Sequence, residues 1–285
     1  MSKGAVFGLS GYRTVNGHRT FMLDLGEPSS DTLFVLIHGW GSTCSAWAEV
    51  LPGLLRIGCA IGLDLRGHGG TPAGDIPVTI DLLVNDVIAA IEQSRRNRVI
   101  LIGHSLGGSI ATMVAVRRPD LVDGVVSIDP SYGARASEMR DVPNRLAAYR
   151  RDGGLDPAES IEGGFSAGAD YGLKLRAAHD VATTPAAVLS SIYESNYLTS
   201  NAIGPITGAA RWVGARVTPT LAFYPNPERA RVDIEHGHQT SISIWNGAGH
   251  FLHQERPDQF VAEIKRWLAG LENDITEFDQ DLTRQ

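Results

Sequence analysis

The chain is poor in cysteine and has no long hydrophobic run. Its only cysteines are Cys44 and Cys59 among 285 residues. They are too few for a disulfide framework or a zinc site, so we expect a reduced, cytoplasmic protein. No apolar stretch approaches the ~20 residues that a membrane-spanning helix needs. The opening residues, MSKGAVFGLSGYRT, contain no apolar core of the kind found in signal peptides.

The chain also lacks an excess of positive charge. Its formal net charge is −7, with 43% hydrophobic and 20% charged residues, which is the composition of an ordinary soluble globular protein. The negative charge argues against nucleic acids and anionic membranes as partners. The sequence shows no metal-binding cluster and no phosphate-binding loop, so we predict no cofactor and no metal. We expect a small-molecule substrate, and a homo-oligomer is compatible with the sequence.

Short apolar runs alternate with helical patterns along most of the chain. Most of the runs are apolar throughout, as in a parallel sheet that helices cover on both faces. Helical spacing of apolar residues is found over 80–91 and 260–271, and residues 1–30 read as an antiparallel entry to the sheet. We therefore predict an α/β fold with a doubly wound, mostly parallel sheet. The predicted strands are 33–38, 59–64, 98–103, 124–129, 220–224 and 241–245.

One interval, residues 131–216, breaks this alternation because it contains no clear strand. A gap of that length is too long for a loop. We interpret it as a helical cap inserted into a core made of residues 1–130 and 217–285. The expected helical stretches of the cap lie near 137–151, 169–179 and 184–193.

The segment LIGHSLGGSI at 101–110 joins a predicted strand to a predicted helix. Within it, GHSLG at 103–107 matches the pattern G-x-S-x-G in the required strand–turn–helix context. Small residues two positions on either side of Ser105 let strand and helix approach closely. The serine then projects above the carboxyl edge of the sheet, where open α/β folds bind ligands. Ser105 is thus a candidate nucleophile; the alternative is a plain glycine-rich turn with Ser105 as a helix cap.

Two further segments end at the same predicted edge. HGW at 38–40 follows the first buried strand, and its loop can aim the Trp40 backbone N–H at the position that the Leu106 N–H also reaches. Two such donors form an oxyanion hole. His250 lies between the last strand and the last helix, where it can be the general base that a serine needs. The alternatives are a core tryptophan in a simple turn and a structural histidine.

Taken together, these motifs resemble the α/β-hydrolase fold superfamily. HGW, DLRGHGGT, GHSLGG and GAGHFLHQERPDQF stand in the family's order and spacing over about residues 33–271. The resemblance implies Ser105 as nucleophile and His250 as base. It also implies the backbone N–H groups of Trp40 and Leu106 as the oxyanion hole.

The same resemblance limits the chemistry. Family branches that open epoxides or remove halogens need a carboxylate nucleophile, whereas position 105 is a serine. Four other histidines belong to framework or pocket-edge positions in this pattern, so no proton transfer is expected of them. They are His38, His68, His104 and His253.

One expected feature of the family is missing. Most members carry the triad aspartate in a G-x-x-D turn after the next-to-last strand, but here that turn reads YPNPE at 224–228. Glu228 falls in the register of the usual acid. Asp129 is the other candidate, because some α/β-hydrolases place the acid after the earlier strand. We favour Asp129, since a carboxylate that ends a buried strand needs a partner such as an imidazolium. Otherwise Asp129 is a turn residue and Glu228 a solvated surface carboxylate.

The sequence therefore predicts a serine hydrolase that cleaves an ester, lactone or amide bond of a small, apolar molecule through an acyl-enzyme. Three alternatives keep the same motifs: a C–C bond hydrolase, a cofactor-free dioxygenase that uses the His–Asp pair, and a non-enzymatic receptor for a small ligand. The apolar pocket is expected from the aromatic residues of the cap. These are Tyr132, Tyr149, Phe165, Tyr171, Tyr193, Tyr197 and Trp212.

Overall fold

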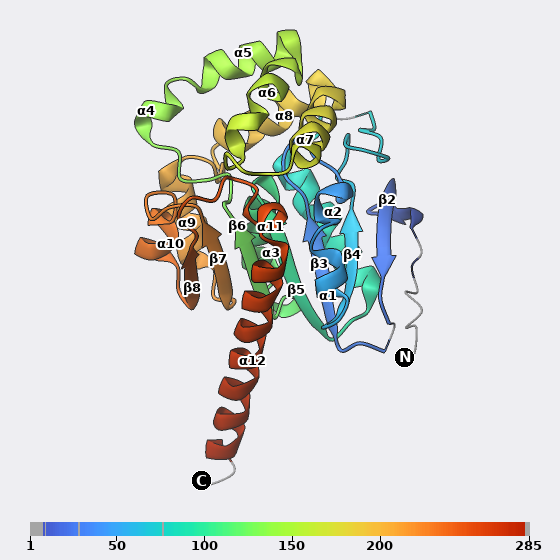
Figure 1. Ribbon diagram of the computed structural model, residues 1–285, viewed down its shortest axis with the longest axis vertical. Helices are drawn as coiled ribbons and strands as arrows, with labels where there is room; N and C mark the ends of the chain where they lie inside the picture. The colour runs from blue at the N-terminus through green and yellow to red at the C-terminus, as the bar shows by residue number, and fades with distance from the viewer. Residues whose placement is uncertain (1–7, 9, 28, 76, 283–285) are drawn as a thin grey trace.

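The computed structural model describes residue 8 and residues 10–27, 29–75 and 77–282. It contains an eight-stranded sheet with the strand order β1-β2-β4-β3-β5-β6-β7-β8 (Figure 1). The strands are β1 (Gly11–Val15), β2 (His18–Leu25), β3 (Thr32–Ile37), β4 (Cys59–Leu63), β5 (Arg98–His104), β6 (Gly124–Ile128), β7 (Thr220–Tyr224) and β8 (Thr240–Ile244). The strands from β3 to β8 pair in parallel, while β1 and β2 form an antiparallel hairpin whose strand β2 pairs with β4. The predicted doubly wound, mostly parallel sheet is confirmed.

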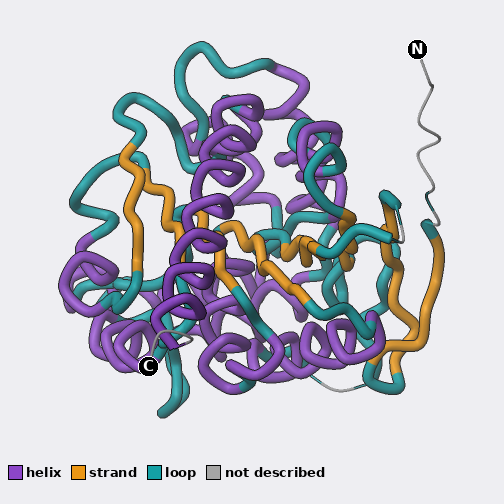
Figure 2. Tube along the Cα trace, turned by 90° about the horizontal axis from the view of Figure 1, so that it is seen from below, coloured by secondary structure: helices purple, strands orange, loops and turns teal. Residues whose placement is uncertain are grey.

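Helices cover both faces of this sheet (Figure 2). The α-helices are α1 (Leu51–Leu54), α2 (Ile80–Ser94), α3 (Leu106–Arg117), α4 (Ala136–Met139), α5 (Val142–Asp152), α6 (Leu155–Ser160), α7 (Tyr171–Thr183), α8 (Ala186–Tyr197), α9 (Ile206–Ala215), α10 (Arg231–His236), α11 (Leu252–Glu255) and α12 (Pro257–Leu282). Short 3₁₀ turns are η1 (Cys44–Trp47), η2 (Pro119–Leu121) and η3 (Ile161–Gly164). None of the described helices is long and apolar enough to cross a bilayer.

Two cores explain why the parallel strands are apolar throughout. Successive side chains of a strand point to opposite faces, so Val35 packs with α2 and α3 on one face. Phe34 and Leu36 instead pack with α12 on the other face. All six residues of β3 are buried, which is the pattern of a strand in the middle of a covered sheet.

Between β6 and β7 the chain builds a layer of helices over the carboxyl edge of the sheet. Helices α4 to α8 lie above this edge in Figure 1. Helix α6 was not expected from the sequence. The last helix of the interval, α9, packs against α3 and α10 beside the sheet. The predicted cap includes all residues from 131 to 216, whereas α9 lies beside the sheet.

The two ends of this helical layer lie side by side. Ala134 forms an isolated parallel bridge with Pro205. Its N–H donates to the Gly204 carbonyl at 2.9 Å, and its own carbonyl accepts from the Ile206 N–H at 2.9 Å. The segment between Ala134 and Pro205 therefore leaves the core and returns to it at one place.

Candidate active site

Ser105 occupies a strained turn between β5 and α3. Its φ is 53° and its ψ is −115°, a conformation that L-residues rarely adopt and that costs ~1–3 kcal/mol. Backbone bonds hold it there: the Ser105 N–H donates to the Ile128 carbonyl at 2.9 Å, and the Ser105 carbonyl accepts from the Ser131 N–H at 3.0 Å. Such strain is typical of functional sites that the surrounding fold over-determines.

The glycines around Ser105 are required by close backbone contacts. A Cβ atom at Gly107 would lie 1.9 Å from the Ile37 carbonyl oxygen, and one at Gly103 would lie 2.2 Å from the Gly107 carbonyl oxygen. No side chain fits at those distances, so the strand and the helix can approach only where glycine is present. The G-x-S-x-G spacing thus has a steric origin in this chain.

The loop after β3 touches this turn. A Cβ at Gly39 would lie 3.3 Å from the Ser105 Cβ, and the Trp40 indole N–H donates to the Leu189 carbonyl at 2.9 Å. In the described part of the chain, the backbone N–H groups of Trp40 and Leu106 have no hydrogen-bond acceptor. Leu106 is the first residue of α3, where N–H groups have no acceptor within the helix. Both N–H groups are free to bind a ligand oxygen.

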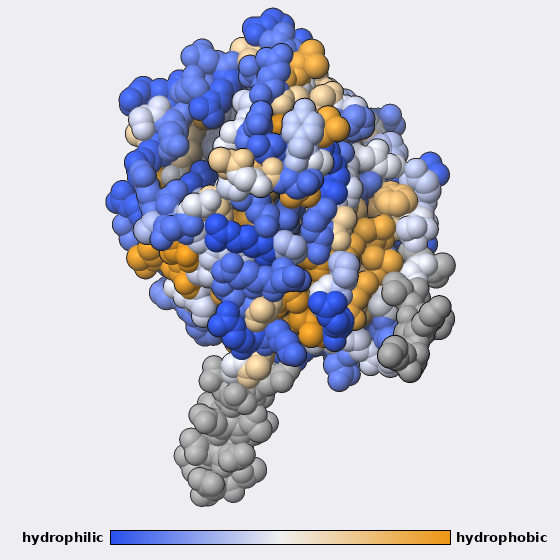
Figure 3. Space-filling model, in the orientation of Figure 1, coloured by the Kyte–Doolittle hydropathy of each residue, from blue (hydrophilic) through white to orange (hydrophobic). Residues whose placement is uncertain are grey.

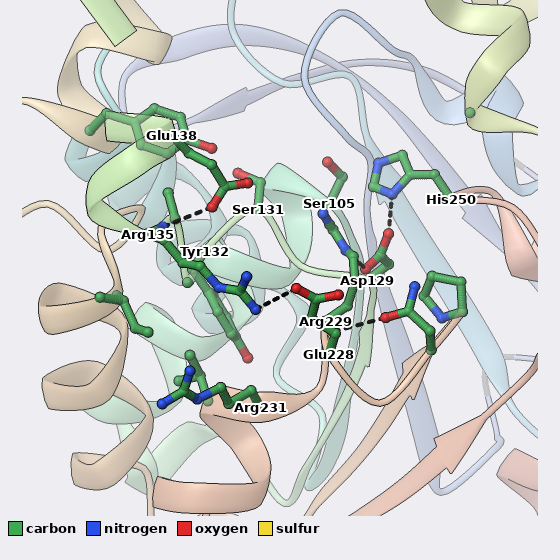
Figure 4. Close-up of a pocket in the computed structure, with 18 of the residues that line it drawn as sticks. Ser105, Asp129, Ser131, Tyr132, Arg135, Glu138, Glu228, Arg229, Arg231 and His250 are labelled. Carbon is green, nitrogen blue, oxygen red and sulfur yellow. Dashed lines mark hydrogen bonds and ion pairs between the residues drawn. The ribbon is translucent and has the colours of Figure 1, made fainter. Parts of the chain in front are cut away.

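His250 and Asp129 form a hydrogen-bonded pair across the sheet edge. The His250 Nδ1 lies 2.5 Å from the Asp129 Oδ2. Asp129 directly follows β6 with a φ of 37°, and its N–H donates to the Phe223 carbonyl at 2.9 Å. The backbone N–H of His250 donates to the carbonyl of Gly164, in the helical layer, at 2.6 Å. Ser105 and His250 face the same part of the cavity in Figure 4.

Asp129 also binds Arg229, a residue that the sequence analysis did not single out. The Arg229 Nε lies 2.6 Å from the Asp129 Oδ1. Only 2% of the Asp129 side chain is exposed. Burial by itself would raise the pKa of this carboxyl, but His250 and Arg229 together hold that pKa below its ordinary value. The carboxylate therefore stays ionised.

Glu228, the other acid candidate, lies apart from His250. Its carboxylate pairs with Arg135 at 2.5 Å, and 68% of its side chain is exposed. The same turn carries Arg229, whose N–H donates to the Asn226 Oδ1 at 3.1 Å. Glu228 therefore sits at the rim of the cavity, and its neighbour Arg229 points inward (Figure 4).

The four histidines that are given no role in proton transfer are buried. They form hydrogen bonds with backbone groups or pack against aromatic rings. His38 accepts from the Leu65 N–H at 2.9 Å, and His68 accepts from the Gly41 N–H at 3.1 Å. Burial and the proximity of His38 lower the pKa of His68 to about 3. His104 binds the His250 carbonyl at 3.0 Å, and burial is the main cause that lowers its pKa well below the ordinary value. These side chains are neutral near pH 7.

A cavity of about 780 Å³ opens beside Ser105, Asp129 and His250. Its lining includes four arginines and three carboxylates, so the expectation of an apolar pocket was wrong. The reason is that several cap aromatics pack elsewhere: Phe165 stacks on Phe251 at 4.1 Å between ring centroids, and Tyr171 is 73% exposed. The outer face of α4 and α5 is likewise hydrophilic in Figure 3. Of the expected aromatics, the lining contains Tyr132, Tyr193 and Tyr197.

Within the described ranges, no group of three or more His, Cys, Asp or Glu side chains is arranged to hold a metal ion. The chemistry that this site can perform with its own residues is that of a hydroxyl, an imidazole–carboxylate pair and two backbone donors. This combination suits attack on a carbonyl carbon.

Comparison with known proteins places the chain in a family. A model of the "Alpha/beta hydrolase family" matches residues 34–263. The chain is 34% identical over 133 residues to Lipase LipV of Mycobacterium tuberculosis, covering 47% of this chain and 49% of that protein. It is 29% identical over 220 residues to a putative esterase/lipase of Haemophilus influenzae, covering 72% of each.

Solved structures agree with this at the level of the fold. The enol-lactonase from Burkholderia xenovorans LB400 superposes with a TM-score of 0.78 at 20% identity, over 91% of this chain and 100% of that one. The chain spans half or less of the length of several curated relatives that it matches, between 22% and 49%. The match of the family model to most of the chain shows that this protein is a member of the alpha/beta hydrolase family.

Proposed function

We propose that the protein is a serine hydrolase that cleaves carboxylic ester or lactone bonds through an acyl-enzyme on Ser105. The observation that carries the proposal is the strained turn at Ser105 in one cavity with the His250–Asp129 pair. Relatives whose names include lipase, esterase and enol-lactonase support ester and lactone substrates.

In the proposed mechanism His250 takes the Ser105 proton as the serine attacks the carbonyl carbon. The backbone N–H groups of Trp40 and Leu106 stabilise the oxyanion of the tetrahedral intermediate, a contribution of ~3–4 kcal/mol for a single donor in well-studied cases. Asp129 holds the proton on His250 Nδ1 and balances the charge of the imidazolium. Collapse of the intermediate expels the alcohol, which receives the proton from His250. Water then attacks the acyl-enzyme with His250 again as base.

Turnover of p-nitrophenyl acetate and butyrate by the wild-type protein and by Ser105→Ala tests this proposal. We expect the variant to lose on the order of 10³-fold or more in kcat, because the members of such a triad work only together. Circular dichroism and thermal unfolding establish that the variant is folded. Activity retained in folded Ser105→Ala would remove the nucleophile assignment.

A further inference from the structure

Arg229 uses only part of its guanidinium on the protein. Its Nε binds Asp129 Oδ1 at 2.6 Å, and 46% of its side chain is exposed. Its two terminal nitrogens have no hydrogen-bond partner among the described residues. A guanidinium presents five donors in a planar fork, so the outer edge of this one remains available in the cavity.

The other arginines of the cavity differ from Arg229 in the carboxylates that they bind, although Arg145 and Arg231 are also bound through Nε. Arg135 pairs with Glu228 at 2.5 Å, Arg145 with Asp141 at 2.7 Å and Arg231 with Glu235 at 2.8 Å. None of these three carboxylates binds His250, although Glu235 has a second nitrogen nearby, the His236 Nε2 at 3.9 Å. The carboxylate of Asp129, in contrast, is shared between Arg229 and His250. Arg229 is therefore the cavity arginine best able to accept a further anionic partner.

The guanidinium of Arg229 lies beside the proposed catalytic residues. The two oxygens of one carboxylate bind His250 and Arg229, so the imidazole and the guanidinium flank Asp129 on either side. Figure 4 shows the guanidinium extending from its turn toward Ser105, alongside Asp129. A group bound by its terminal nitrogens would thus lie in the same cavity as a carbonyl carbon attached to Ser105.

We infer that Arg229 binds a carboxylate of the substrate and that the enzyme prefers esters whose acyl part carries such a group, as in half-esters of short dicarboxylic acids. The inference rests on the proposed function. A planar carboxylate matches the arginine fork, and one guanidinium balances its single charge. A phosphate dianion would need a second cation beside Arg229, whereas each of the other cavity arginines is already paired with a carboxylate that His250 does not share.

Arg229 also orients Asp129, so a loss of activity alone would not establish substrate binding. The discriminating quantity is the ratio of kcat/KM for mono-p-nitrophenyl glutarate to kcat/KM for p-nitrophenyl valerate. The two acyl chains have the same length, and only the first bears a carboxylate. We expect Arg229→Gln to lower this ratio about tenfold to hundredfold, the range for a hydrogen-bonded charge pair. Arg231→Gln, which removes a paired arginine from the same cavity, should leave the ratio unchanged.

An equal loss on both substrates in Arg229→Gln would overturn the inference, because Arg229 would then act through Asp129 alone. Arg229→Lys keeps the charge but loses the fork, and we expect it to recover part of the ratio. A lysine variant no better than glutamine would count against recognition of the substrate's charge.

A binding experiment separates this inference from the proposed catalytic role of Ser105. Calorimetric titration of folded Ser105→Ala with monomethyl glutarate should give binding that the additional change Arg229→Gln weakens at least tenfold. Methyl valerate should show no such difference between the two proteins. Absence of monomethyl glutarate binding, or binding unaffected by Arg229→Gln, would overturn the anion site even if Ser105 proves to be the nucleophile. Binding that depends on Arg229, in a protein without esterase activity, would support the anion site and count against the proposed function.

Discussion

At the scale of single residues, two substitutions test the proposal that Asp129, which the sequence already favours over Glu228, is the acid of the triad. Asp129→Asn should lower kcat by on the order of 10²–10⁴-fold, because an amide favours the wrong tautomer of His250 and cannot balance its charge. Glu228→Gln should cost less than about tenfold, since that carboxylate is 68% exposed and pairs with Arg135 at the rim. The kcat of each variant with p-nitrophenyl butyrate is the measurement that identifies the acid. The reverse order of effects would restore glutamate as the acid.

A second residue-scale prediction concerns His253, which is fully buried. In the described part of the chain neither of its ring nitrogens has a hydrogen-bond partner. Burial, together with His250, lowers its pKa from 6.5 to about 3. Between these two pKa values the folded state therefore binds fewer protons than the unfolded state. The free energy of unfolding consequently decreases as the pH falls below about 6.5.

His253→Phe removes this proton linkage. We expect the free energy of unfolding to fall less steeply between pH 6.5 and pH 4, by up to ~1.4 kcal/mol per pH unit. Urea denaturation at several pH values measures the slope. His179→Gln is the matched control, because that histidine side chain is 72% exposed. An unchanged slope in His253→Phe would mean that His253 does not resist protonation in the folded protein.

At the scale of elements, the helical layer can be removed where its two ends meet. Replacing residues 136–204 with a short linker should leave the sheet and α9 able to fold, because Ala134 and Pro205 are already adjacent. It should also lower kcat, since the Gly164 carbonyl that holds the His250 N–H at 2.6 Å is lost. Far-ultraviolet circular dichroism and ester turnover are the measurements. Full activity in the shortened chain would show that the layer does not hold His250.

The steric fit of the β5–α3 turn gives a further element-scale prediction. Gly107→Ala would put a methyl group 1.9 Å from the Ile37 carbonyl oxygen, a contact that only a backbone shift can relieve. We expect a loss of several degrees in Tm and of most esterase activity, because the shift moves Leu106 and its N–H. Gly270→Ala is a suitable control, since a Cβ there meets nothing within 4 Å. A Gly107→Ala protein as stable and as active as the wild type would contradict the packing described for this turn.

At the scale of the whole molecule, the sheet and the segments that bear the candidate residues could be predicted from the sequence. The strands were visible because buried parallel strands are apolar on both faces, and GHSLG because close backbone contact requires its glycines. The contact of Arg229 with Asp129 could not be predicted. It joins residues one hundred positions apart, and an arginine in a proline-rich turn looks like any solvated surface residue. The polarity of the cavity was missed because a pattern of aromatics does not distinguish the lining of a pocket from the packing between helices.

The most direct test of the account is intact-mass spectrometry after treatment with a fluorophosphonate. We predict one adduct per chain, located by peptide mapping on Ser105 and absent from Ser105→Ala. The reaction should be slowed strongly in Asp129→Asn, because the proposed mechanism activates the serine through His250. Contradiction would come from a folded wild-type protein that gains no mass, or from an adduct at another residue that persists in Ser105→Ala.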